Sequence, residues 1–514
     1  MKRMKESNSA AVVGKAILAA SLLLAAGCGM WAVGPDYKAP DVTVADLSAP
    51  DAGYPTTNKT ATGEFRSAAK ADDPRVEITA DVIRAWWGQF NDPVLTGLVD
   101  AAVSNNVSFL MAQERLVQAR WTLVGSAAAF MPAVTMDGTY ARSGAHKFTS
   151  SRWGTGSSYH GDHFSSGFDA SWEIDVFGGV RRSYESAEAS LGQAEASLEN
   201  AWVTLAAEIG SEYITLRTAQ VRLKVARANL KLQSETYDIL KSRLDSGIGD
   251  ELAVKQAKYN VEQTRASIPN ILALEERCMN SLAILAGVMP GTLHGRLRDM
   301  PERDWLIAPQ RLAGIPLDAM RSRPDVRAAE RALAAQSAAV GVATSRLFPK
   351  FYINGSLGLD SVEASKFFRR EAFLASIGPS FSWPIFQGGN LVANMKREES
   401  KMSELALAYE LALQKSVEET RNAYSAYTQE YHRYQSLQGA VEAARSAVDI
   451  ANDLYKNGLA DFNNVLDAQR SLLVLEESLV VSRGTISMDL VALYKALGGG
   501  VAPLSGEDPA KGSE

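Results

Sequence analysis

The chain has little cysteine and histidine, with two cysteines and five histidines among 514 residues. Cys28 closes a leader sequence, so only Cys278 remains in the body of the chain and no internal disulfide can form. No histidine begins an HExxH motif, and no GxSxG, P-loop or CxxC sequence occurs. We therefore predict that the protein is not an enzyme and holds neither a metal nor a cofactor.

Three of the histidines, His146, His160 and His163, fall in what we expect to be a long loop between two strands. His160 and His163 could be metal ligands, but histidines in an exposed polar loop are usually not. We predict no metal site there.

Positive charge is also in short supply, because 53 Lys and Arg stand against 59 Asp and Glu. The formal net charge of -6 leaves no basic footprint for nucleic acid. The hydrophobic fraction of 46% is nevertheless large enough for a sizeable core, so a disordered chain is not expected.

Residues 1–27 have the pattern of a bacterial signal peptide, in which basic residues precede the apolar run 16–26. That run is too short to span a bilayer and ends in LAAGC, residues 24–28, which resembles the lipoprotein signal-peptidase site. We predict that Cys28 is acylated, as by palmitate, and becomes the mature N-terminus. Gly29 follows it in place of the Asp typical of inner-membrane retention, which favours the outer membrane. An ordinary secretory signal is the alternative.

The sequence contains an internal duplication. The sequence GFDASWEIDVFGGV at residues 167–180 reappears in outline as GPSFSWPIFQGGNL at 378–391, and residues 112–138 match 329–355. A fixed long period indicates a structural repeat. This unit is much longer than a solenoid repeat, so we predict two duplicated halves of one architecture.

Four segments alternate apolar and polar residues with a period of two, namely 134–144, 167–177, 351–360 and 373–385. Their length of about ten residues and their pattern are typical of transmembrane β-strands, although a soluble antiparallel sheet shows the same alternation. Four strands cannot close a barrel, and open edges are not tolerated in lipid. We therefore expect the chain to oligomerise. The polar faces, which carry Asp169, Glu173 and Asp175, are expected to line a water-filled barrel.

Long helical hairpins are predicted over residues 180–287 and 390–497. Apolar residues recur every seven positions, which predicts coiled-coil packing; they are Ile209, Leu216, Leu223, Leu230, Tyr237 and Leu244, and in the second half Tyr427, Tyr434, Val441, Val448 and Tyr455. The helices are too polar for lipid and should project into the periplasm. Each hairpin should turn at glycine, at Gly247 and Gly249 in the first and Gly458 in the second.

These patterns predict the following organisation, listed in chain order: a signal peptide, 1–27; a lipidated extended segment, 28–85; a first repeat, 86–300; a second repeat, 301–497; and a disordered tail, 498–514.

Several motifs together resemble the TolC family of outer-membrane efflux proteins, in particular the OprM- and NodT-like lipoprotein branch that serves resistance-nodulation-division (RND) pumps. They are GPDYKAP at 34–40, WWGQF at 86–90, RPDV at 323–326, LFP at 347–349, FSWPIF at 381–386 and LDAQ at 466–469. The resemblance covers nearly the whole mature chain. It implies a mainly α fold with a transmembrane β part: a lipid-anchored homotrimer with a twelve-stranded outer-membrane barrel. A periplasmic α-helical tunnel would be opened by a periplasmic adaptor and an inner-membrane RND pump.

The resemblance also implies pore and gate residues. Asp467 matches an aspartate that faces the tunnel near its closed tip, where three copies would form an acidic, cation-attracting ring; the alternative is a solvated surface carboxylate. Asn464 stands where the TolC pattern has a second aspartate. Tyr455 fits a tyrosine of the gate latch, but Ala460 replaces the TolC arginine. Gly247, Gly249 and Gly458 would form the tip turns that meet the adaptor.

The function that these inferences imply is the outer-membrane channel of a tripartite RND efflux system, a passive conduit that exports small toxic molecules and so confers drug resistance. The alternative in the same fold is a conduit for type I protein secretion with an ATP-binding-cassette (ABC) exporter. A third reading, a structural coiled-coil tether of the envelope, does not need the four alternating strands. The sequence does not specify the exported compound.

Overall fold

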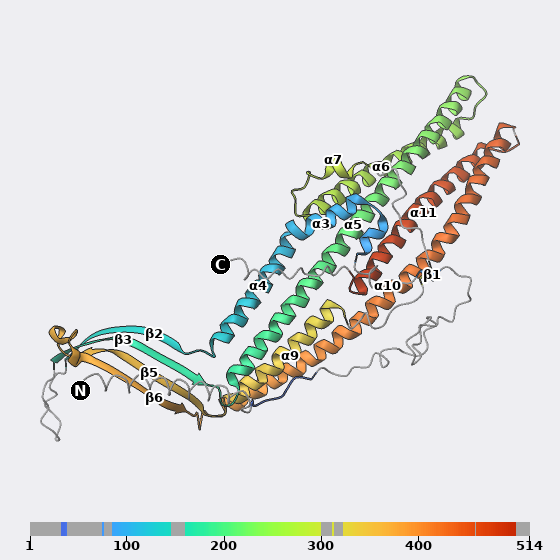
Figure 1. Ribbon diagram of the computed structural model, residues 1–514. Helices are drawn as coiled ribbons and strands as arrows, with labels where there is room; N and C mark the ends of the chain where they lie inside the picture. Colours follow the sequence, from blue (N-terminus) through green and yellow to red (C-terminus); the bar gives the residue numbers. More distant parts are fainter. Residues whose placement is uncertain are drawn as a thin grey trace, which may run out of the picture. The chain divides into compact units, whose positions relative to one another are not determined.

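The computed structural model describes residues 32–38, 75–76, 85–144, 160–299, 311–312, 322–457 and 459–499 (Figure 1). Several expected features lie outside these described residues: the signal peptide with Cys28, most of the segment 28–85, His146, the turn residue Gly458 and almost all of the tail.

The first half of the chain runs through helices, a strand pair and a long helical hairpin. Its elements are η3 (Trp86–Phe90), α3 (Pro93–Asn105), α4 (Val107–Ala128), β2 (Ala133–Gly144), β3 (His160–Ile174), α5 (Gly179–Asp245), α6 (Glu251–Leu285) and α7 (His294–Leu297). A short parallel pairing joins β1 (Arg75–Val76) to β4 (Arg311–Leu312).

The second half repeats the same order. Its elements are α9 (Pro324–Ser345), β5 (Lys350–Ser361), η4 (Ala364–Lys366), η5 (Arg370–Ala372), β6 (Phe373–Ser382), α10 (Asn390–Lys456) and α11 (Phe462–Ala496). The long helices α5 and α10 each have 67 residues, and the returning helices α6 and α11 each have 35. A helix of 67 residues is about 100 Å long. The heptad residues expected to face inward are all buried or half-buried.

The four long strands form one antiparallel sheet in the order β2-β3-β5-β6, so that strands of both halves pair through β3 and β5 (Figure 1). The register places apolar residues on one face, including Met136, Phe168, Leu357, Ile377 and Phe381. These side chains are exposed, and Ile377 is 83% exposed. The sheet therefore has an apolar face that no other part of the described chain covers.

Strand bounds differ most from expectation in β3, which begins at His160 and ends at Ile174, where 167–177 was expected. His160 and His163 thus belong to a strand, where a loop was expected. The last strand, β6, ends at Ser382, three residues earlier than predicted. The stretch 160–166 contains one large apolar residue, Phe164, so it carries almost no alternating pattern.

The chain divides into two compact units that do not coincide with the repeats. One unit comprises residues 1–40, 117–193 and 329–408, and it contains the sheet with the adjoining helix segments. The other comprises residues 41–116, 194–328 and 409–514, and it contains the remainder of the two hairpins. Each unit takes parts of both repeats, as expected where strands of both halves share a sheet.

The motif WWGQF forms part of the core of the second unit. Trp86 is fully buried and stacks on Tyr494 of α11, with ring centroids 6.2 Å apart. The Tyr494 hydroxyl donates to Gln89 Oε1 at 2.9 Å. Gly210 of α5 lies beneath Trp86, and a Cβ there would come within 2.3 Å of the indole ring. Close packing of a short 3₁₀ helix against α5 and α11 explains these residues.

The root of each hairpin is closed in the same way. Asn106, just before α4, donates its side-chain N–H to the carbonyl of Leu285 at the end of α6, at 2.9 Å. Arg323, just before α9, donates to the carbonyl of Ala496 at the end of α11, also at 2.9 Å. Such bonds satisfy carbonyl groups that a helix end leaves without a partner. The repeated contact extends the duplication to individual side chains.

Within the described residues, no single helix has the length and apolar character needed to cross a bilayer. The pair α3 and α4 passes the same length and composition test only when taken together, across a 44° bend.

Candidate pore, gate and anchor sites

The tip of the first hairpin is built from Gly247 and Gly249. Gly247 has a φ of +76°, and its N–H bonds the carbonyl of Leu244 at 2.8 Å. The N–H of Ile248 bonds the carbonyl of Arg243 at 3.1 Å, which completes a Schellman ending. At Gly249 a Cβ would lie 2.5 Å from the backbone nitrogen of Leu244. Both glycines are therefore required by the turn itself.

The tip of the second hairpin shares the main bond of the first. The N–H of Leu459 bonds the carbonyl of Leu454 at 2.9 Å, across the turn whose glycine, Gly458, lies outside the described residues. Leu459 is 75% exposed and Ile248 at the first tip is 73% exposed. Each tip thus presents an apolar side chain to its surroundings.

Near the tips, one apolar cluster joins the two hairpins. Its buried residues come from α5, α6, α10 and α11, and they are Leu240, Ala253, Val254, Ala257, Ala451, Phe462, Val465 and Leu466. Tyr455 packs against this cluster, with its ring 5.1 Å from that of Phe462. The tyrosine predicted to act in the gate is thus held at the contact between the hairpins.

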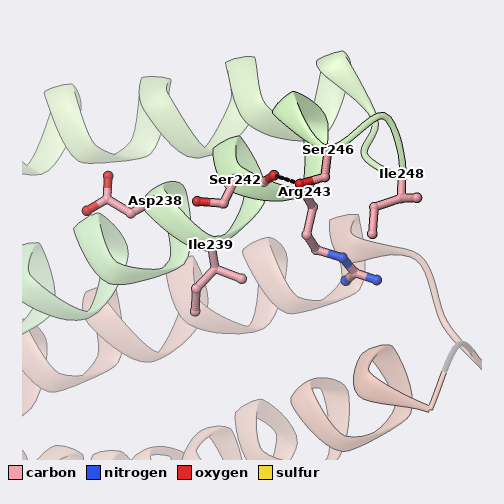
Figure 2. Close-up of a pocket in the computed structure, with 6 residues that line it drawn as sticks. All are labelled: Asp238, Ile239, Ser242, Arg243, Ser246 and Ile248. Atoms are coloured by element: carbon pink, nitrogen blue, oxygen red, sulfur yellow. Dashed lines mark hydrogen bonds between the residues drawn. The ribbon is translucent and has the colours of Figure 1, made fainter.

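Arg243 of α5 contacts Tyr455 of α10. Figure 2 shows the Arg243 side chain extending from the first hairpin toward the second. Its Nη1 donates to the Tyr455 hydroxyl at 3.0 Å, and its guanidinium carbon lies 5.5 Å from the ring centroid. The sequence suggested no arginine partner, because Ala460 occupies the TolC position. The partner comes instead from the other repeat, 212 residues away in the sequence.

An open surface depression of about 420 Å³ adjoins this contact on the first hairpin (Figure 2). It is lined by Asp238, Ile239, Ser242, Arg243, Ser246 and Ile248. Ile239 and Ile248 are both well exposed. The depression therefore combines exposed apolar side chains with a charged rim directly beside the tip turn.

Asp467 and Asn464 both lie on α11 and are exposed. Their spacing of three residues places them on one helix face. The residues between them, Val465 and Leu466, are buried in the tip cluster. The carboxylate of Asp467 therefore points away from the contact between the hairpins.

The polar face of the sheet carries connected side chains. Glu173 accepts from Lys350 Nζ at 3.0 Å. Ser171 donates to Asn354 Oδ1 at 2.9 Å, and Asn354 donates in turn to Ser380 at 2.7 Å. Asp169 shares this face, by its register opposite Ser356.

Asp175 is placed differently from the other two predicted lining acids. It follows the last residue of β3, and its carboxylate accepts the backbone N–H groups of Val180 at 3.0 Å and Arg181 at 2.9 Å. These bonds satisfy free amides at the start of α5, and a negative charge there is favoured by the helix dipole. Asp175 therefore serves the transition from strand to helix.

His163 lies in β3 and pairs with Asp360 of β5, with Nε2 and Oδ2 3.1 Å apart. Across the described part of the chain, no three His, Cys, Asp or Glu side chains are grouped so that they could hold a metal ion.

The segment 32–38, which follows the predicted lipidation site, is held in place by contacts with α5 and α9. Arg182 of α5, only 6% exposed in its side chain, bonds Asp36 at 2.5 Å and reaches the carbonyls of Val33 and Gly34. The Arg182 hydrogen bond and charge lower the pKa of the Asp36 carboxyl. Gly34, at a φ of +99°, touches Gly341 of α9, and a Cβ at residue 34 would come within 2.5 Å of it. These contacts explain Gly34 and Asp36 of the GPDY motif.

Duplicated strand pairs that lead into long helical hairpins, with strands of both halves in one sheet, define the fold of TolC-like outer-membrane channels. The model of the family described as "Outer membrane efflux protein" matches residues 98–288 and 315–499. The chain belongs to this family, which consists of channels.

Relatives match over almost their whole length. Nodulation protein T of Rhizobium leguminosarum bv. trifolii is 30% identical, over 94% of this chain and 97% of its own. The pyoverdine export outer membrane protein OpmQ of Pseudomonas aeruginosa is 28% identical, over 82% of this chain and 88% of its own. The solved structure of the outer-membrane channel OprN is 33% identical, with a TM-score of 0.79, and the match covers 91% of this chain and 99% of that one.

Proposed function

We propose that this protein is the outer-membrane channel of a tripartite RND efflux system and conducts small toxic molecules passively to the exterior. The main support for the proposal is that one face of the sheet is apolar and exposed, while the other face bears hydrogen-bonded polar groups. Such a sheet fits a barrel with lipid outside and water inside. Membership of the outer membrane efflux protein family supports the same conclusion.

Three copies would close the barrel. Within one chain, β2 and β6 are edge strands of a four-stranded sheet, and unpaired edges are not tolerated in lipid. Joining β6 of each copy to β2 of the next gives twelve strands and no free edge. In this arrangement Asp169 and Glu173 line the lumen.

The periplasmic tips would contain the gate and the adaptor contact. The Arg243–Tyr455 contact would hold the two hairpins together in the closed state. Asp467, with Asn464 beside it, would face the tunnel, and three copies would form an acidic ring that attracts cations. The exposed Ile248 and Leu459 beside the turn glycines would be covered when a periplasmic adaptor docks and an inner-membrane RND pump engages.

The N-terminus would be lipid-anchored through Cys28. Ala32 is the fourth residue after Cys28, and four residue steps of extended chain span at most about 14 Å. Ala32 lies against Gly178, directly between β3 and α5, where a Cβ at residue 178 would come within 2.7 Å of it. An acyl chain on Cys28 would therefore enter the leaflet next to the end of the strands, which suits an outer-membrane lipoprotein.

Single-channel recording of the purified protein in planar bilayers tests the pore assignment. Asp467→Asn removes the proposed ring charge and should move the reversal potential in a KCl gradient toward zero cation preference. Asp238→Asn, which removes a carboxylate at the surface depression of Figure 2, is the matched control and should leave the potential unchanged. No ion-conducting channel from the wild type, or equal reversal potentials in all three proteins, would contradict the assignment.

A further inference from the structure

The connection between β5 and β6 is a compact loop (Figure 1). It lies at the end of the two strands opposite to the end where α9 leads into β5 and β6 leads into α10. Two short 3₁₀ turns, η4 and η5, are held by backbone bonds between residues three apart. They include Arg369 N to the carbonyl of Lys366 and Ala372 N to the carbonyl of Arg369, each 3.0 Å. Ala372 is buried beneath them. The loop is therefore a platform with a defined backbone.

A row of aromatic rings connects the apolar face of the sheet to this loop. Tyr140 and Phe164 have ring centroids 4.9 Å apart, and Phe164 lies 6.3 Å from Phe367. Phe367 in turn packs edge-on against Phe368 at 5.0 Å. Phe368 is 86% exposed. Because Tyr140 and Phe164 share the apolar sheet face, the loop continues the surface proposed to contact lipid.

Two arginines follow the aromatic pair directly. Lys366 in the same loop is engaged by Glu363, 2.7 Å away, and the hydrogen bond and charge of Glu363 raise its pKa. Glu371 also acts on Lys366. Arg369 and Arg370 are both exposed, and among the described residues neither has an ion-pair partner. The platform thus ends in two guanidinium groups that remain available to an external anion.

We propose that the loop of residues 362–372 binds phosphate-bearing glycolipid headgroups of the outer leaflet. Phe367 and Phe368 enter the interface between headgroups and acyl chains, where aromatic side chains are favoured. Arg369 and Arg370 bind the phosphates, which match the planar guanidinium fork. The inference rests on the proposed membrane barrel and adds a lipid partner to it. The occupant is lipid because the loop extends the exposed apolar face, while the two exposed guanidinium groups can bind its anionic phosphates.

The first test replaces Phe368 by the photo-crosslinker benzoylphenylalanine in cells, a substitution that keeps an aromatic ring. Irradiation should join the chain to lipopolysaccharide, detected as an adduct that reacts with antibody to lipid A. The same replacement at Phe381, on the apolar face of β6, should give adducts with membrane lipid. Lipid adducts at 381 without lipopolysaccharide adducts at 368 would overturn the inference alone, as would adducts at 368 with a second copy of the chain. Failure at 381 would instead overturn the barrel.

The second test measures binding of diphosphoryl lipid A and of dephosphorylated lipid A to the full-length protein purified in detergent. The wild type should bind the phosphorylated form about tenfold more tightly, since each basic residue adds attraction to an anionic surface. The double variant Arg369→Gln/Arg370→Gln should lose this preference. The control Arg115→Gln/Arg120→Gln removes two exposed arginines of α4 and should retain it.

Equal affinity of the wild type for the two lipids would overturn the proposal, and this comparison does not depend on whether the variant assembles. A variant that assembles and still prefers the phosphorylated lipid would also overturn it.

Discussion

At the tip, the residues that hold the hairpins together come from different halves of the sequence. Tyr455 of the second hairpin receives a hydrogen bond from Arg243 of the first, and the guanidinium also lies over its ring. Both side chains are at least partly exposed, so the pair contributes modestly, about 1 kcal/mol. A contact of that size suits a gate that a docked partner must be able to open.

Removing either side of this contact should favour the open channel. Tyr455→Phe and Arg243→Gln should each raise the single-channel open probability about fivefold, which corresponds to about 1 kcal/mol. The double variant should open no more than either single variant, because the two residues act through one bond. Lys241→Gln, an exposed change two residues away on α5, is the control. Additive effects in the double variant would show that the residues act separately.

A second residue, Asp489 of α11, makes the stability of the folded protein depend on pH. Burial, with a smaller contribution from the charge of Glu430, raises the pKa of Asp489 from 3.8 to about 6. The folded protein therefore holds this proton more tightly than the unfolded chain does. The stability linked to it is complete below about pH 3.8 and is lost as the pH rises through about 6.

Asp489→Asn should remove this dependence. The thermal midpoint of the detergent-solubilised wild type should fall between pH 5 and pH 7, whereas the midpoint of the variant should stay level across that interval. Measurement by scanning fluorimetry at constant ionic strength checks this. A wild-type midpoint that rises over the same interval would contradict the assigned direction.

Among the elements, the last turns of α6 and α11 are held by equivalent side chains, Asn106 and Arg323, whose hydrogen bonds differ in strength. Asn106 is neutral and makes one bond to the end of α6. Arg323 is charged, only 7% exposed in its side chain, and also bonds Asp325 at 2.7 Å and Glu419 at 2.6 Å. Bonds to charged groups are stronger than those between neutral groups. The hairpin that carries Tyr455 and Asp467 thus has the firmer root.

Substitutions at these two positions should therefore differ in effect. Arg323→Ala should weaken the end of α11 by about 3 kcal/mol, because it leaves Glu419 without its donor and leaves the Ala496 carbonyl only the 3.2 Å bond from Thr420, while Asn106→Ala should cost the end of α6 about 1 kcal/mol. Hydrogen exchange of the last turns of α6 and α11, compared with wild type, measures both. An equal increase in the hydrogen-exchange rate at the two helix ends would show that Arg323 does not hold α11 more strongly than Asn106 holds α6.

Elements with a strong period were predictable from sequence, and elements defined by distant partners were not. Alternation located the cores of all four long strands, and the heptads located both hairpins within a few residues. The start of β3 was missed because residues 160–166 contain one large apolar side chain. Asp175 continued the alternation beyond the strand, although its carboxylate caps α5.

Contacts between side chains that are far apart in the sequence could not be predicted from the sequence. Arg217 is fully buried and donates to Gln220 and to the carbonyls of Leu297 and Asp299, yet it lies within an ordinary helical pattern. Arg182 likewise binds the segment 32–38, although no sequence pattern around it indicates this contact. The GPDY and WWGQF motifs suggested a family but not the packing of Gly34 or Trp86, which depends on α9, α5 and α11.

At the scale of the whole molecule, neither half of the duplicated chain forms a unit by itself. β3 of the first half pairs with β5 of the second over eleven residues, from Phe164 opposite Ser361 to Ile174 opposite Phe351. Each compact unit likewise takes segments from both repeats. The two halves therefore have to fold together, and the single sheet that results has edges that suit closure with further copies.

Whether this channel serves an RND pump can be decided by a cross-linked pull-down of the tagged full-length protein from native membranes. Mass spectrometry of the captured inner-membrane partner should identify an RND pump together with its periplasmic adaptor. Capture should fall when the exposed tip residues Ile248 and Leu459 are both changed to Ser, because they flank the proposed docking turns. Recovery of an ABC exporter in place of the RND pump would contradict the efflux function and make the protein a secretion conduit.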